Sequence, residues 1–288
     1  MAMTAIAIMM MIIPWDNPHG NAPLQIMAQH QQFSLPSWTI GALTEKFSPK
    51  YGTPQLSDTE VLTSYFNLIK QSANTQRGQT DSSVEIQPLR IATEDIVAKK
   101  IATYFKKNAV GESTFGDIFP PLLFKFEDPP YVLVISPRNR IEIQMTQLLK
   151  QDMNLLEIQH LEKIGADQNL SVFVTRVGGI ATFPSFIAPP TTLHQAITLV
   201  IHEWVHHYLF FQPLGQNYWS SPEMTTINES AADLISHEIA RLIEPKTSVT
   251  GTIKPTTQVN YNQINVARIL RQTRLKTERL LAESRIEE

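Results

Sequence analysis

The sequence has no cysteine, so disulfide bonds and thiolate metal sites are excluded, although this absence says nothing about the compartment. It also has no excess of basic residues, because 24 Lys and Arg stand against 27 Asp and Glu and give a formal net charge of −3. No nucleic-acid partner is therefore expected. The chain contains no Gly-rich phosphate loop, no nucleophile elbow and no internal repeat.

An apolar run of the roughly 20 residues that cross a bilayer is also lacking. Residues 1–13 (MAMTAIAIMMMII) are almost wholly apolar, but they have neither the positive charge nor the cleavage site of a signal peptide. They are either the remaining half of a membrane anchor that starts upstream, or a strand or helix packed on the protein body. We favour the anchor, because so long an uncharged run is unusual at a free, soluble N-terminus. We therefore expect membrane association through a single N-terminal anchor, with the side of the membrane left open.

Residues 191–211 (TTLHQAITLVIHEWVHHYLFF) are apolar on nearly every side of the expected helix, which is typical of a buried helix. Within them lies an H-E-x-x-H motif that begins at His202 and ends at His206. Residues four apart share a helix face, so both imidazoles point to one place, as in a zinc site. Glu203 lies about 100° round the helix, where it can reach a metal-bound water without being a ligand.

A third ligand has to come from elsewhere in the chain. The metzincin continuation would need Gly at position 209 and His at position 212, where this chain has Leu209 and Gln212. Downstream, Ser221 is the predicted N-cap of a second helix, on which Glu229 and Asp233 are four residues apart and share a face. Glu229 can complete a His-His-Glu site. Asp233 can accept a hydrogen bond from the outer ring nitrogen of a ligand histidine.

The pair of motifs, H-E-x-x-H followed by N-E-x-x-x-D, resembles the gluzincin, or thermolysin-like, zinc metallopeptidases. The resemblance implies one Zn²⁺ per chain, bound by His202, His206 and Glu229. It also implies that Glu203 is the general base and that Asp233 orients the first histidine. Gluzincins often place a Tyr or His near the reacting oxygen, and Tyr218, between the two helices, is the candidate to polarise the scissile carbonyl.

The resemblance therefore predicts a zinc metallopeptidase that hydrolyses peptide bonds through a metal-bound water. The surrounding sequence is similar to uncharacterised bacterial proteins that have the same motifs and an N-terminal hydrophobic segment, which brings no known substrate. The alternative is a zincin-like, membrane-anchored binding or assembly protein with a structural metal and little or no catalysis. The intact Glu203 argues against this alternative, because a protein that needs only the metal has no use for the base.

The expected fold class is α+β, mainly helical and zincin-like, with a small sheet beside the active-site helix. The predicted domains are a hydrophobic segment 1–14, a helical region 15–130 packed on the catalytic part, and the catalytic domain 131–288. Further helices are predicted at 57–73, 93–108 and 264–288, a loop at 74–90, a helical stretch at 140–165 with a break near Asp152, and strands at 131–135, 169–177 and 180–187.

Two of these predictions bear on the site. In gluzincins a sheet-edge strand near the active helix binds the substrate backbone, and the strand at 180–187 is the candidate; the alternative is a plain hairpin. His207 follows the ligand His206 but points about 100° away from it, so we interpret it as a packing or interface histidine.

Overall fold

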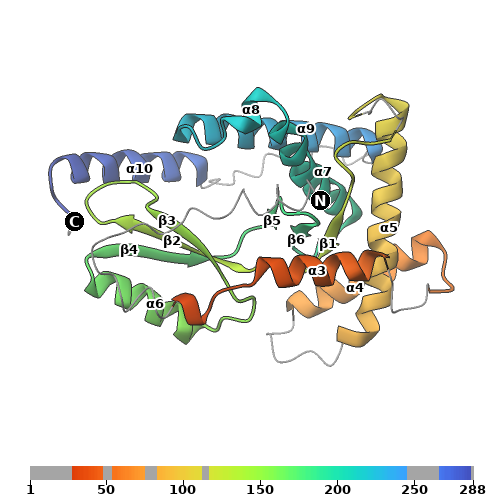
Figure 1. Ribbon diagram of the computed structural model, residues 1–288, viewed down its shortest axis with the longest axis horizontal. Coiled ribbons are helices and arrows are strands. Elements are labelled where there is room, and N and C mark those ends of the chain that lie inside the picture. Colours follow the sequence, from red (N-terminus) through yellow and green to blue (C-terminus); the bar gives the residue numbers. More distant parts are fainter. Residues whose placement is uncertain (1–27, 48–53, 75–82, 112–116, 245–265, 287–288) are drawn as a thin grey trace, which may run out of the picture. The chain divides into compact units, whose positions relative to one another are not determined.

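The computed structural model describes the chain over residues 28–47, 54–74, 83–111, 117–244 and 266–286. These residues form mixed and mainly helical structure, which confirms the predicted α+β class. They divide into two compact units, and their helices and strands are labelled in Figure 1. The apolar residues 1–13, on which the anchor prediction rests, lie outside the described ranges. No helix within those ranges has the length and apolarity to cross a bilayer.

The first unit combines elements from Ser34–Pro129 with elements from residues 177–244. In chain order they are α3 (Leu35–Phe47), α4 (Asp58–Asn74), α5 (Ser83–Lys107), β1 (Phe124–Phe126), β5 (Gly179–Ile180), β6 (Ser185–Ile187), α7 (Leu193–Phe210), α8 (Pro213–Gln216) and α9 (Pro222–Ile243). In its small sheet, β6 lies between β1, which is parallel to it, and β5, which is antiparallel. α7 packs against α9, α5 and β6, and its buried side chains form the middle of the core.

Local capping signals start three helices of this unit where the sequence predicts them. Ser57 and Glu60 form the capping box of α4, with the Ser57 N–H donating to Glu60 Oε2 at 2.9 Å. The hydroxyl of Thr192 accepts from the backbone N–H three residues on at 3.1 Å, and Ser221 does the same for α9 at 3.3 Å. These bonds satisfy amides that have no partner inside the helix.

α5 begins earlier than predicted. The sequence predicts a loop at 74–90 and a helix only from 93, whereas the helix starts at Ser83 and contains Pro88. A proline inside a helix removes one backbone hydrogen bond and is normally unfavourable. Ile86 and Leu89 pack against the core on either side of it, so tertiary burial outweighs this local preference.

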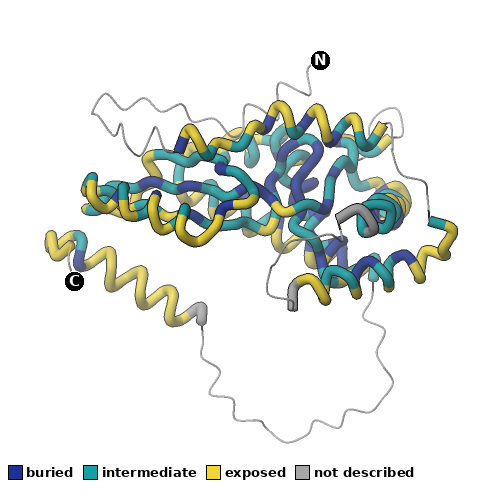
Figure 2. The backbone as a smooth tube through the Cα atoms, turned by 90° about the horizontal axis from the view of Figure 1, so that it is seen from below, coloured by how far each residue is buried: buried dark blue, intermediate teal, exposed yellow. Residues whose placement is uncertain are grey.

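The second unit contains β2 (Tyr131–Pro137), β3 (Met145–Leu149), α6 (Leu155–Asp167), β4 (Leu170–Thr175) and α10 (Val266–Ala282). Its sheet is antiparallel with the order β3-β2-β4, and α6 packs on it through the buried Leu161. Figure 2 shows that α10 is exposed along nearly its whole length. The predicted division keeps residues 131–288 together, whereas the structure assigns 130–176 to one unit and 177–244 to the other.

The prediction of helical structure from 140 to 165 is wrong for its first part. Residues 145–149 form β3, which pairs with β2 from Ile135↔Met145 to Tyr131↔Leu149. Met, Gln and Leu in this segment are good helix formers, but pairing with the preceding strand, β2, outweighs that weak preference. The predicted break near Asp152 is present, and α6 begins after Asn154, which forms a capping box with Glu157.

The prediction of one strand over 180–187 is also wrong, because the segment folds back on itself. β5 and β6 pair as Gly179↔Ile187 and Ile180↔Phe186, and the chain reverses between them. Pro184 lies at this reversal; proline has no N–H for a sheet ladder and is excluded from central strands. Because β6 is the central strand of its sheet, β5 is the edge strand on this side among the described residues.

Candidate metal centre

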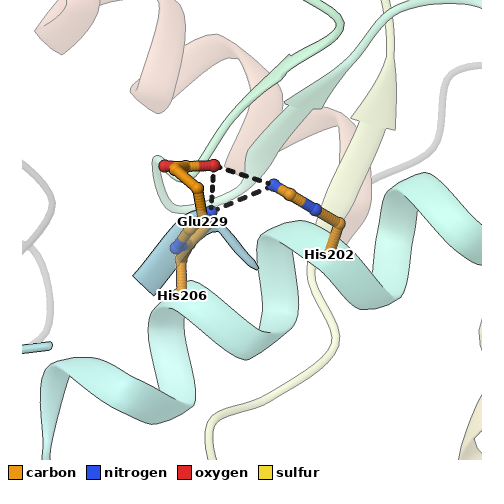
Figure 3. Close-up of side chains that lie close together, drawn as sticks. All are labelled: His202, His206 and Glu229. Carbon is orange, nitrogen blue, oxygen red and sulfur yellow. Dashed lines mark hydrogen bonds and ion pairs between the residues drawn. The ribbon is translucent and has the colours of Figure 1, made fainter. Parts of the chain in front are cut away.

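His202 and His206 project from one face of α7, one helical turn apart. Their Nε2 atoms are 3.1 Å from each other, as expected for residues at positions i and i+4 (Figure 3). The flanking positions of α7, including Ile201 and Val205, are buried in the core, so the helix holds the two imidazoles in a fixed relation. Two of the three donor atoms of the site are therefore set by one rigid element.

Glu229 comes from α9, which packs along α7, and its carboxylate completes the group. Its Oε2 atom is 3.4 Å from His202 Nε2 and 3.5 Å from His206 Nε2 (Figure 3). A tetrahedral ion with bonds of about 2.0–2.1 Å needs donor atoms about 3.3–3.4 Å apart. The three atoms therefore fit a small divalent cation, and they are the group in the described part of the chain that can hold a metal.

The Nδ1 atom of each histidine contacts a side-chain oxygen atom of a residue on α9. Asp233 Oδ1 is 3.0 Å from His202 Nδ1, and Asn228 Oδ1 is 2.9 Å from His206 Nδ1. An oxygen acceptor at Nδ1 favours the tautomer with the proton on Nδ1, which leaves the Nε2 lone pair directed at the shared point. Asp233 therefore lies where the sequence predicts it.

Asn228 is a site residue that sequence reasoning missed. It is almost fully buried, and its amide also donates to Leu214 O at 3.4 Å. The available signal was its position directly before Glu229, since it is the first residue of the N-E-x-x-x-D pattern. An amide at that position carries no charge and no ligand role, so the pattern alone did not predict its contact with His206.

Glu203 does not join the three donor atoms but lies buried beside them. Burial raises its pKa to about 7, and the negative charge of Glu229 adds to this, whereas the two histidines lower it. The pKa of Glu229 lies well below its usual range, because the imidazoles of His202 and His206 and the hydroxyl of Tyr218 lie against its charged form.

Tyr218 lies at the site and contacts Glu229. Its hydroxyl donates to Glu229 Oε1 at 2.5 Å, and its ring packs edge-on against the His206 ring with the ring centroids 6.1 Å apart. Burial, together with the neighbouring Glu229, raises the pKa of the Tyr218 hydroxyl, which stays protonated. Tyr218 thus holds the oxygen of Glu229 that faces away from the histidines.

His207 packs away from the site, as the sequence predicts. Burial lowers its pKa to about 4, and the backbone of Ala181 and Thr182, in the reversal between β5 and β6, partly offsets this. The Phe183 ring lies 6.0 Å away, centroid to centroid. His207 therefore stays neutral and lies against the β5–β6 reversal.

Comparisons with protein-family models, with curated proteins and with solved structures give no match for this chain. The function is therefore argued from the geometry of the site and from the chemistry of its residues.

Proposed function

We propose that this protein is a zinc-dependent peptidase with a zincin-like fold of the gluzincin type. The observation that carries the proposal is the convergence of two imidazole nitrogens and one carboxylate oxygen beside a buried carboxyl group. His202, His206 and Glu229 would hold the metal, and Glu203 would act as the general base. The substrate would be a peptide or a protein.

The donor set favours zinc over the other common divalent cations. Two imidazole nitrogens with one carboxylate suit Zn²⁺, whereas Mg²⁺ and Ca²⁺ take oxygen ligands. Three protein ligands are also typical of catalytic zinc sites, which leave one position open. When bound, zinc lowers the pKa of a coordinated water and polarises the scissile carbonyl.

Glu203 carries the proton transfer in this proposal. A general base is most effective when its pKa lies near the working pH, and burial raises the pKa of Glu203 above its usual range towards that of neutral solution. Its carboxylate takes a proton from the attacking water and later passes it to the leaving amine. A structural metal site has no need of this group, which favours the peptidase over the binding or assembly protein.

Tyr218 supports the ligand Glu229 in this proposal. With Oε1 bound to the Tyr218 hydroxyl, Oε2 is left to face the two histidines. A direct role in polarising the scissile carbonyl requires the hydroxyl to turn from Oε1 towards the substrate. We therefore propose that the main role of Tyr218 is to orient the metal ligand Glu229.

The small sheet beside α7 supports the zincin-like assignment. In gluzincins the strand near the active helix binds the substrate backbone, and β5, the antiparallel edge strand, is the candidate for this role here, in place of the predicted 180–187. We propose that an extended substrate pairs with β5 by backbone hydrogen bonds.

Metal analysis of the purified protein, paired with digestion of a broad peptide library, tests the proposal. We expect close to one zinc per chain and cleavage of some library members that stops when a chelator removes the metal. One zinc per chain without cleavage would favour the binding or assembly protein with a structural metal. Absence of zinc from protein loaded and dialysed in vitro would overturn the metal site itself.

Asp233→Asn is expected to weaken zinc binding by about 10–100-fold, because the substitution replaces the carboxylate that contacts His202 Nδ1 with an amide. The zinc Kd is measured by competition with a chromophoric chelator. Glu238→Gln is the matched control, since Glu238 is an exposed acid on the same helix that pairs with Arg241. An unchanged Kd in Asp233→Asn would show that this carboxylate does not support the site.

A further inference from the structure

We propose that Gly179 in β5 is a positioning residue: its bare backbone is the surface against which the Glu203 carboxylate is held. A side chain at this position would displace the base and leave the three metal ligands in place. The catalytic part of this inference rests on the proposed function, whereas the contact between Gly179 and Glu203 does not.

The space at Gly179 is already filled by Glu203. A Cβ atom at Gly179 would lie 2.8 Å from Glu203 Cδ and 3.1 Å from Cγ, and closer still to Oε1. These three atoms are its nearest neighbours, so the first obstacle to a side chain at Gly179 is the side chain of Glu203. Carbon atoms in contact normally lie about 3.5–4.0 Å apart, so the carboxylate has to move.

Backbone conformation does not explain the glycine. Among the described glycines, the left-handed region is occupied by Gly111, and Gly179 lies outside it. An alanine would therefore be tolerated by the backbone of β5, and the remaining obstacle is steric. The neighbouring Gly178 offers the contrast, because a Cβ there would meet Leu199 Cδ2 at an ordinary 3.9 Å.

The position of β5 beside α7 is fixed by hydrogen bonds and by a buried neighbouring strand. It pairs with β6, whose Phe186 and Ile187 are fully buried, and Ala188 N donates to Gly178 O at 2.8 Å. In the reversal that follows β5, the Phe183 ring lies 6.0 Å from the His207 ring of α7, centroid to centroid. With the strand fixed on both sides, the flexible side chain of Glu203 gives way.

Gly179→Ala is therefore expected to separate catalysis from metal binding. We expect zinc to stay at one per chain with an unchanged Kd, and kcat to fall by about 10²-fold or more with little change in KM, since the base is displaced. Gly178→Ala is the matched control and is expected to retain wild-type kcat and zinc content. Wild-type kcat in Gly179→Ala would overturn the positioning role.

A melting experiment tests the contact without using activity. Gly179→Ala is expected to lower the Tm of the zinc-loaded protein by roughly 2–6 °C, because the methyl group and the carboxylate compete for one space. In a Glu203→Ala background the same substitution should cost little, since truncation of Glu203 makes room for the methyl group. An equal fall in Tm in both backgrounds would overturn the contact. A wild type that cleaves no peptide would overturn the proposed function and the catalytic part of this inference, and the melting cycle would still decide the contact.

Discussion

Glu203→Gln is expected to slow peptide hydrolysis by about 10²–10⁴-fold, the usual contribution of a general base. Glutamine keeps the size of the side chain and its ability to hydrogen-bond, but its amide cannot accept the proton from the attacking water. Zinc content and Tm should barely change, because Glu203 lies beside the three donor atoms and is not one of them. The measurements are kcat on a library-derived peptide and zinc per chain.

The matched control for this substitution is Glu238→Gln, the same change at an exposed position of α9. It should retain full activity and zinc. Hydrolysis that continues at the wild-type rate in Glu203→Gln would mean that Glu203 is not the base, and loss of zinc in this variant would mean that it is a ligand. Loss of hydrolysis with retained zinc separates the peptidase from the binding or assembly protein.

Glu229→Ala is expected to abolish stoichiometric zinc binding and, with it, hydrolysis. The substitution removes the one donor atom that α9 contributes to the group and leaves two imidazoles on α7. Loss of a supporting residue costs about 10–100-fold in affinity, so loss of a ligand should cost more than that. Zinc per chain after dialysis is the measurement, and His202→Ala and His206→Ala should behave in the same way.

Glu223→Ala is the control for the ligand substitution, because Glu223 is another acid on α9, in its first turn. It should retain zinc and activity, since it does not belong to the convergent group. Stoichiometric zinc that persists in Glu229→Ala and disappears in the double variant with Glu223→Ala would show that Glu223 is the third ligand.

The two helices of the site were predictable because their signals are local. The apolar pattern of 191–211 depends on the period of a single helix. The N-caps Thr192 and Ser221, and Pro222 at the first position of α9, act within one or two turns of their own helix. The four-residue spacing of His202 and His206 is likewise a property of a single helix.

The strands were harder to predict because pairing is a long-range property. Residues 145–149 have the composition of a helix and become β3 by pairing with β2, with paired residues 10 to 18 positions apart in the chain. The segment 180–187 has the apolar composition of one strand, but it reverses at Pro184, and β6 pairs both with β5 and with the distant β1. In both cases pairing with another strand decides the structure, and the composition of the segment does not show it.

The sequence by itself determined the candidate site residues: the H-E-x-x-H spacing, the acid pair Glu229 and Asp233, and the absence of cysteine ligands. Only the tertiary structure decided that Glu229 faces both histidines, that Asn228 supports His206, and that β5 lies against Glu203. The physical reason is the range of the interactions. Helix period and capping depend on neighbours within a few residues, whereas the approach of α9 and β5 to α7 depends on side chains packed from distant parts of the chain.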